Sequence, residues 1–118
     1  MSLEVKTTSY VFHITSEKEF NEIITRAATN KMTVFAKFGA TWCGPCKRIE
    51  PFYEILAGLH KSSIFLDINV DKVTELCGPY NISSLPTFLV FKEGKYAELM
   101  KGANQKRLKE LIENQLSI

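Results

Sequence analysis

The sequence predicts an α/β domain in which helices cover both faces of a mixed β-sheet. Segments rich in β-branched and aromatic residues alternate with segments whose apolar residues recur at helical spacing. The last two strand-like segments are joined by a short turn, which indicates an antiparallel hairpin. The 118 residues suit a single domain, 1–118, with one hydrophobic core.

The first strand is expected in "SYVFHIT", which is rich in β-formers. A helix follows in "SEKEFNEIITRAATNK", and Ser16 with Glu19 predicts a capping box at its start. Its apolar face consists of Phe20, Ile23, Ile24 and Ala27. The run "MTVFAKFGA" is interrupted only by Lys37 and is typical of a central strand covered on both faces.

A second helix is predicted from Gly44 to about His60. Its apolar face consists of Ile49, Phe52, Tyr53, Leu56 and Leu59. Pro51 lies inside it and removes the amide that would bond to the carbonyl of Lys47. We therefore predict a kink at this proline.

The second half of the chain contains three strands and two helices. "SIFLDINVD" indicates a buried strand, and "KVTELCGPYN" predicts a short helix that Gly78 and Pro79 end. "TFLVF", the turn "KEGK" and "YAELMKG" predict a hairpin, and "NQKRLKELIENQL" closes the chain as an amphipathic helix. The result is a three-layer α/β/α arrangement: a central mixed five-stranded β-sheet, parallel in the middle, flanked by four helices.

Charge and composition exclude several classes of function. The formal charge of +2 comes from 15 basic and 13 acidic residues spread along the chain, so we expect no nucleic-acid partner. The apolar runs are strand-sized, so we expect no membrane span. "MSLEVKTTSYVF" lacks the pattern of a secretion signal. The chain has three cysteines, an odd number, which argues against the disulfide framework of a secreted protein. We therefore expect a cytoplasmic protein with functional thiols.

Two of these cysteines, Cys43 and Cys46, lie in "ATWCGPCK" between the predicted central strand and the second helix. Open α/β sheets usually place their functional sites just past the carboxyl ends of the strands. The N-terminus of the helix that follows favours an anion. Cys43 should therefore form a thiolate readily and attack a disulfide. Cys46, one helical turn later, can displace the mixed disulfide. Pro45 is tolerated in the first turn, and Gly44 leaves the approach open.

Two other interpretations of the cysteine pair are less favoured. A structural zinc site needs four ligands, and only Cys77, His13 and His60 remain, scattered over other segments. We therefore expect no metal. Two packing cysteines would not need Trp42 and a Gly-Pro pair around them at a strand-helix junction. Cys77 is expected to be a buried thiol, with dimer formation or regulatory oxidation as the alternatives.

The segments "ATWCGPCKRIEPF" and "SLPTFLVFKEGK" resemble the thioredoxin family, and the resemblance covers nearly the whole chain. It implies a thioredoxin fold and a dithiol that reduces disulfides in protein substrates. It also implies re-reduction by a flavin-containing thioredoxin reductase that uses NADPH. The redox-active disulfide would then need no further cofactor, and we expect a monomer.

The resemblance also assigns residues around the cysteines. Pro86 matches a proline that is cis in the family and faces the dithiol, and the backbone before it would pair with an extended substrate. Residues expected to border a flat apolar substrate patch are Trp42, Leu85, Pro86, Gly102 and Ala103. The alternative for Trp42 is a place in the core.

Lys37 departs from the family pattern. Six positions ahead of Cys43, thioredoxins usually carry a buried aspartate that manages the proton of the second cysteine. Asp67 stands where many of them have a lysine. Our hypothesis is that Lys37 and Asp67 face each other beneath Cys46 with their charges exchanged. The alternative is that Lys37 buries its stem and reaches solvent.

These features predict a protein-disulfide reductase in which Cys43 attacks and Cys46 resolves. A more oxidising exchanger or isomerase would share the fold but tends to have a histidine between the cysteines, and Pro45 disfavours it. A binding module that scaffolds partners without turnover would not need an intact cysteine pair.

Overall fold

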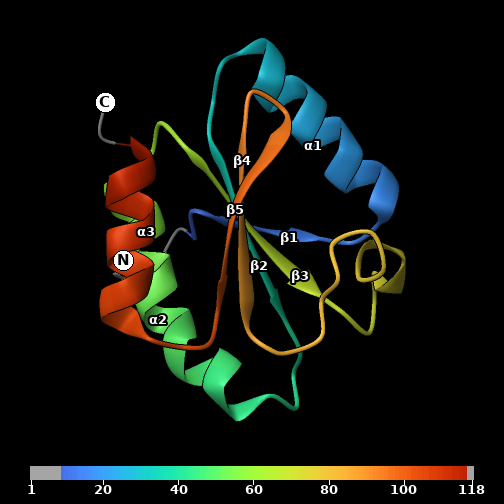
Figure 1. Ribbon diagram of the computed structural model, residues 1–118, viewed down its shortest axis with the longest axis vertical. Helices are drawn as coiled ribbons and strands as arrows, with labels where there is room; N and C mark the ends of the chain where they lie inside the picture. Colours follow the sequence, from blue (N-terminus) through green and yellow to red (C-terminus); the bar gives the residue numbers. More distant parts are fainter. Residues whose placement is uncertain (1–8, 117–118) are drawn as a thin grey trace, which may run out of the picture.

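In the computed structural model, which describes residues 9–116, a five-stranded sheet separates α1 on one face from α2 and α3 on the other (Figure 1). The strands are β1 (Val11–Ile14), β2 (Val34–Gly39), β3 (Ile64–Asn69), β4 (Thr87–Lys92) and β5 (Lys95–Lys101). The helices are α1 (Glu17–Thr29), α2 (Gly44–Leu59) and α3 (Gln105–Leu116), with a short 3-10 helix, η1 (Thr74–Leu76). None of the helices described is long and apolar enough to cross a membrane.

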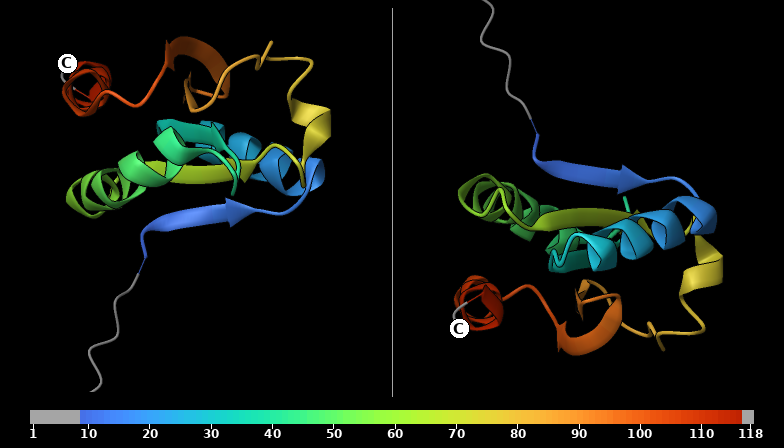
Figure 2. Two further views of the ribbon diagram at one scale, coloured as in Figure 1. Left: turned by 90° about the horizontal axis from the view of Figure 1, so that it is seen from below. Right: turned by 90° about the horizontal axis from the view of Figure 1, so that it is seen from above.

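The strand order is β1-β3-β2-β4-β5, with β1 and β5 at the two edges (Figure 2). The strands β1, β3 and β2 are parallel, whereas β4 runs antiparallel to β2 and β5 antiparallel to β4. Phe38, near the end of β2, pairs with Thr87 at the start of β4. The carboxyl ends of β2 and β3 and the start of β4 therefore lie together at one end of the strands.

The prediction of four helices is wrong for the described residues, because the segment "KVTELCGPYN" contains only the three-residue helix η1. Val73 and Thr74 are β-branched, while Gly78 and Pro79 stop the segment before a stable helical nucleus forms. The expectation of parallel middle strands also fails at β4. A parallel crossover needs an element that runs the length of the sheet, and the segment 70–86 instead returns at the end where β3 stops.

The start of α1 follows the predicted capping box only in part. The Glu19 backbone N–H donates to the Ser16 hydroxyl oxygen at 3.1 Å, as expected for an N-cap. The Glu19 carboxylate, however, accepts from the Thr15 backbone N–H at 2.8 Å rather than from Ser16. The cap thus reaches one residue further back than predicted and secures the exit from β1.

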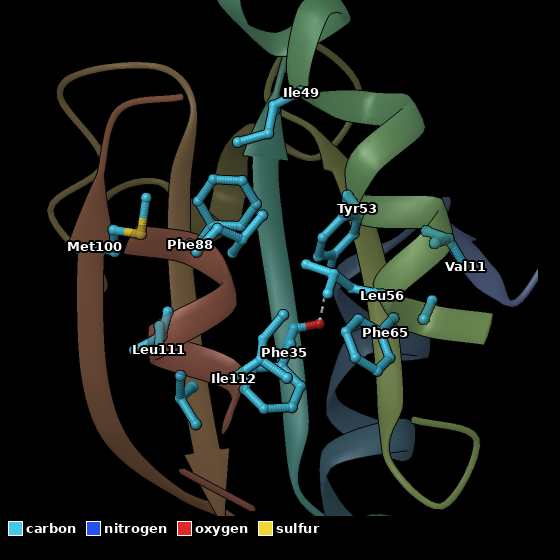
Figure 3. Close-up of a cluster of buried hydrophobic side chains, with 13 residues drawn as sticks. Val11, Phe35, Ile49, Tyr53, Leu56, Phe65, Phe88, Met100, Leu111 and Ile112 are labelled. Carbon is cyan, nitrogen blue, oxygen red and sulfur yellow. Dashed lines mark hydrogen bonds between the residues drawn. The ribbon is translucent and has the colours of Figure 1, made fainter. Parts of the chain in front are cut away.

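On the face of the sheet covered by α2 and α3, a cluster of large side chains fills the space between helices and strands (Figure 3). Tyr53 of α2 lies at its centre, and its hydroxyl can donate to the carbonyl oxygens of Phe35 at 3.0 Å and Leu66 at 2.8 Å. These bonds tie α2 to β2 and β3. Leu59, predicted on the inward face, is 70% exposed because it occupies the last position of α2.

The opposite face packs under α1 around Phe20 and Ala27, and Ile23 and Ile24 lie half-buried against this cluster as predicted. The short helix η1 contributes Leu76 to the same core. On the other side, α2 continues through Pro51 to its end. The kink at Pro51 stays a prediction.

The β4–β5 hairpin turns at Glu93 and Gly94, which have φ angles of 52° and 78°. Positive φ at both central residues characterises a type I′ turn, whose twist matches that of the flanking strands. A methyl group on Gly94 would lie 3.0 Å from the Cβ of Ala28, so the turn also packs closely on the end of α1.

Candidate active site

Cys43 and Cys46 form a disulfide at the amino end of α2, with their Cα atoms 5.3 Å apart. Cys43 is the N-cap of α2, and its Sγ accepts a hydrogen bond of 3.2 Å from the Cys46 backbone N–H. Pro45 falls in the first turn, where no amide is needed. The sulfur of Cys43 is therefore aligned with the positive end of the helix dipole.

A surface depression of about 570 Å³ opens beside Cys43, and we call it the active-site groove. The residues that line it include Trp42, Cys43, Gly44, Pro45, Ser84 and Leu85. Trp42 is 69% exposed, so the alternative that it belongs to the core is wrong. Its indole Nε1 donates a hydrogen bond of 2.8 Å to Asp71 Oδ2.

The Leu85–Pro86 peptide bond is cis, as the resemblance implied, and it directly precedes β4. The Pro86 carbonyl accepts from the Gly102 backbone N–H at 2.9 Å, so the end of β5 lies against this proline. Ala103 is half-buried and packs against the α2 and α3 core. The structure therefore brings Leu85 into the groove and places Gly102 beside Pro86, while Ala103 packs against the core and is not among the residues that line the groove.

Lys37 and Asp67 are paired neighbours on β2 and β3, and the lysine Nζ lies 3.8 Å from Asp67 Oδ1. Lys37 is only 3% exposed, so the alternative in which it reaches solvent is wrong. On the other side of Asp67, its Oδ2 lies 3.4 Å from Nδ1 of His13 on β1. Burial raises the pKa of Asp67, and the opposing attraction of Lys37 and His13 does not cancel that effect.

A second cavity, of about 290 Å³, lies on the inner side of the disulfide, and we call it the Lys37 cavity. Its walls include Cys46, Lys37, Asp67 and His13. A methyl group on Gly39 would lie 3.3 Å from Cys46 Sγ and 3.5 Å from Lys37 Cε. Because Gly39 has no side chain, only the space that its Cβ would occupy lies between the Lys37 stem and Cys46 Sγ.

Sequence reasoning missed two residues at this site. Asp71 follows the third strand at the same sheet edge as the cysteines, and that position is the signal that could have identified it. His13 carries no such signal, because its contact with Asp67 depends on the register between β1 and β3.

Among residues 9–116, no group of three or more histidine, cysteine, aspartate or glutamate side chains could hold a metal ion. Cys77 is a free, half-buried thiol that borders the active-site groove. Burial raises its pKa, and the nearby carboxylates of Asp71 and Glu75 raise it further. This thiol is therefore a weaker nucleophile near neutral pH than an ordinary cysteine.

Comparison with known proteins gives a consistent answer. The thioredoxin family model matches residues 11–114. Thioredoxin 1 of Plasmodium falciparum is 44% identical over 100 residues, covering 85% of this chain and 92% of its own length. A solved structure of Plasmodium falciparum thioredoxin has a TM-score of 0.82 at 42% identity, covering 87% of this chain and 97% of that one.

A solved wild-type thioredoxin h from poplar has a TM-score of 0.88 at 32% identity, covering 92% of this chain and 98% of that one. The matched residues 11–114 contain all five strands, α1, α2, most of α3 and both active-site cysteines. The chain therefore belongs to the thioredoxin family, and its activity is thiol–disulfide exchange through Cys43 and Cys46.

Proposed function

We propose that Cys43 is the attacking thiolate and Cys46 the resolving thiol in the reduction of protein disulfides. In the first step the Cys43 thiolate attacks one sulfur of a substrate disulfide, whose other sulfur leaves as a thiolate. In the second, Cys46 gives up its proton and attacks Cys43 Sγ, which releases the remaining substrate sulfur. Two electrons pass to the substrate, and the Cys43–Cys46 disulfide remains.

The position of Cys43 carries this assignment. Its sulfur borders the active-site groove and accepts the Cys46 amide at the amino end of α2. A helix N-terminus stabilises a thiolate, and the thiolate is the reactive form. Gly44 and Pro45 form the first turn that sets the distance between the two sulfurs.

Cys46 suits the second step by its position. Both cysteines are nearly buried, at 6% for Cys43 and 3% for Cys46, but Cys43 lines the groove whereas Cys46 lines the Lys37 cavity. A protein substrate cannot reach it directly, whereas Cys43 Sγ is already within bonding distance. Lys37 and Asp67 lie on the same inner side and are the residues that we assign to adjusting its proton.

The groove suits an extended segment of a protein substrate. Trp42 and Leu85 supply apolar surface beside Cys43, and the backbone before Pro86 can pair with the segment as an added strand. Gly102, whose backbone N–H donates to the Pro86 carbonyl, and Ala103 next to it are the residues that we assign to the border of the substrate patch. An open, shallow shape favours many substrates over one small ligand.

The family relationship supports the rest of the cycle that we propose. A thioredoxin reductase, drawing on NADPH, returns the Cys43–Cys46 disulfide to the dithiol, and the protein acts as a monomer. A pair that must be kept reduced suits a reducing compartment, and we therefore propose a cytoplasmic location.

The direct test is insulin reduction with dithiothreitol, followed by the precipitation of the free insulin B chain. The wild-type protein should accelerate precipitation, and Cys43→Ser should abolish the effect. Cys46→Ser, reduced and then freed of dithiothreitol before it is mixed with insulin, should retain one round of attack. It should accumulate a mixed disulfide that mass spectrometry detects, because no dithiothreitol is then present to cleave it. No acceleration by the reduced wild-type protein would contradict the proposal and favour a binding module.

A further inference from the structure

The most unusual feature of the site is a buried lysine beneath the disulfide. Lys37 is 3% exposed, although burying an ammonium group is costly unless it is paired. Asp67 pairs with it at 3.8 Å, and the side chain of Asp67 is itself only 19% exposed. The sequence could have placed an apolar residue here, as it does at Phe35 two positions earlier on the same face of β2.

The geometry places the end of the Lys37 stem close to Cys46. Lys37 and Gly39 lie on the same face of β2, since side chains alternate along a strand. A methyl group at Gly39 would touch both Cys46 Sγ and Lys37 Cε, so these two atoms are separated by little more than the space of one side chain. Lys37 Nζ also lies 6.0 Å from the Tyr53 ring centroid.

We propose that the Lys37 ammonium is the counter-ion of the Cys46 thiolate, and that Asp67 and His13 hold it in position for this purpose. The proposal rests on the role of Cys46 as the resolving thiol. A cation close to a thiol in a poorly solvated site favours the thiolate and lowers the pKa of that thiol. A carboxylate at the same place would have the opposite effect.

Other charged groups face the cavity from every element around it. They are Lys37 on β2, Asp67 on β3, His13 on β1, Lys47 and Glu50 on α2, and Lys72 after β3. Lys47 and Lys72 are exposed and screened by water. Glu50 raises the pKa of Asp67, which is a smaller effect on that carboxyl than its burial or the attraction of Lys37. Lys37 is thus the buried cation of this set.

In the second step of exchange, the Cys46 thiolate is the species that the Lys37 charge stabilises. Cys46 releases its proton to water in the Lys37 cavity, and Lys37 stabilises the thiolate that remains. The thiolate forms a bond to Cys43 Sγ, and the bond between Cys43 and the substrate sulfur breaks. The substrate sulfur leaves with the electron pair, so charge and atoms balance.

The test is a titration of Cys46 alone, in a Cys43→Ser, Cys77→Ser background where no other thiol remains. Thiolate absorbance near 240 nm is followed against pH, after subtraction of the variant that also lacks Cys46. This background is compared with the same protein carrying Lys37→Met, Lys37→Gln, Lys37→Arg or Asp67→Asn. Lys109→Met, on the exposed face of α3, is the matched control for loss of one lysine.

Lys37→Met and Lys37→Gln should each raise the midpoint by about one pH unit, a roughly tenfold loss of thiolate below the midpoint. Two uncharged variants are used so that the test does not depend on the folding of one. Lys37→Arg should restore a midpoint near that of the background. Asp67→Asn should lower the midpoint, because it leaves the lysine charge uncompensated, and Lys109→Met should not move it.

A midpoint that stays in place in both uncharged variants would overturn the proposal. So would shifts of the same sign in Lys37→Met and Asp67→Asn, which would indicate a structural disturbance instead of a charge effect. Insulin reduction by the wild-type protein separates this failure from that of the proposed function. An active protein with an unmoved midpoint loses only the role of Lys37.

Discussion

The indole of Trp42 is anchored by Asp71, whose Oδ2 accepts from Nε1 at 2.8 Å. Trp42 precedes α2, whereas Asp71 follows β3, so this bond joins two loops at the same edge of the sheet. The Asp71 backbone N–H in turn donates to Asn69 Oδ1 at 2.9 Å, which fixes the loop that carries the carboxylate. The exposed indole therefore has a defined orientation beside Cys43.

Asp71→Ala should weaken the reduction of protein substrates. Without its acceptor the indole regains rotational freedom, and ordering such a side chain again on binding costs about 1 kcal/mol, or roughly fivefold in kcat/KM. The measurement is insulin reduction at substrate concentrations below KM. Asp71→Asn keeps a carbonyl acceptor and is the control, so equal losses in both variants would contradict the explanation.

Three glycine-to-alanine variants separate backbone strain from steric conflict. Gly94→Ala should destabilise the protein most, because Gly94 has a φ of 78° and its new methyl would lie 3.0 Å from Ala28 Cβ. Gly102→Ala meets nothing within 4 Å but has a φ of 96°, so only the backbone penalty of about 1–2 kcal/mol should remain.

Gly78→Ala is the matched control, since a methyl there meets nothing within 4 Å and the backbone is not left-handed. Urea denaturation of the three oxidised variants and the wild type should rank their free energies of unfolding accordingly. A loss in Gly78→Ala as large as that in Gly94→Ala would contradict this account.

Asp67 makes stability depend on pH with a definite sign. Burial raises its pKa above the ordinary value of 3.8, so the folded state binds this proton more tightly than the unfolded state. Its contribution to stability is therefore fully present below pH 3.8 and is lost as pH rises through the raised value. Relative to Asp67→Asn, the wild-type protein should lose stability over that interval.

The measurement is the free energy of unfolding of both proteins from acid to neutral pH. Asp67→Asn also removes the ion-pair partner of Lys37, which shifts the free energy of unfolding by a constant amount at all pH values. Only the change with pH of the difference in unfolding free energy between the two proteins tests the titration of Asp67. Asp71→Asn, measured alongside, corrects for the loss of one carboxylate. A difference that grows in favour of the wild type as pH rises would show that the Lys37 ion pair outweighs burial.

Cys77 should react slowly with alkylating reagents. In a Cys43→Ser, Cys46→Ser variant it is the only thiol, and its raised pKa leaves less thiolate at neutral pH than an ordinary cysteine has. The iodoacetamide rate at pH 7 should be lower in the folded protein than in the same protein unfolded in urea. Equal rates would contradict this prediction and would favour the alternative in which Cys77 is oxidised for regulation.

Much of the fold could be predicted from local patterns. The five strands, α1, α2 and α3 each have a periodic apolar face and clear ends, such as Ser16 before α1. The helix expected around Leu76 fails because propensity and length there are marginal, and the packing of Val73 and Leu76 under α1 is satisfied by a single 3-10 turn. The direction of β4 depends on that same segment.

The site was predictable where it depends on sequence spacing and not where it depends on register. Cys43 and Cys46 are separated by one helical turn, which any helix would bring together. The row that runs from His13 through Asp67 to Lys37 instead requires β1, β3 and β2 to pair in one register, although these residues are distant in sequence. The family pattern suggested that Asp67 and Lys37 pair, whereas nothing in the sequence suggested the contact of His13.

The disulfide stands between two spaces of different character, an open groove on the Trp42 side and an inner cavity on the Lys37 side. With the proposed roles of Cys43 and Cys46, electrons reach the substrate on the groove side and the Cys46 proton leaves on the cavity side. Substitutions in the groove can change which proteins are recognised while the driving force stays the same. Substitutions around the cavity can retune that driving force while the repertoire of partners is preserved, so the two properties are free to diverge independently.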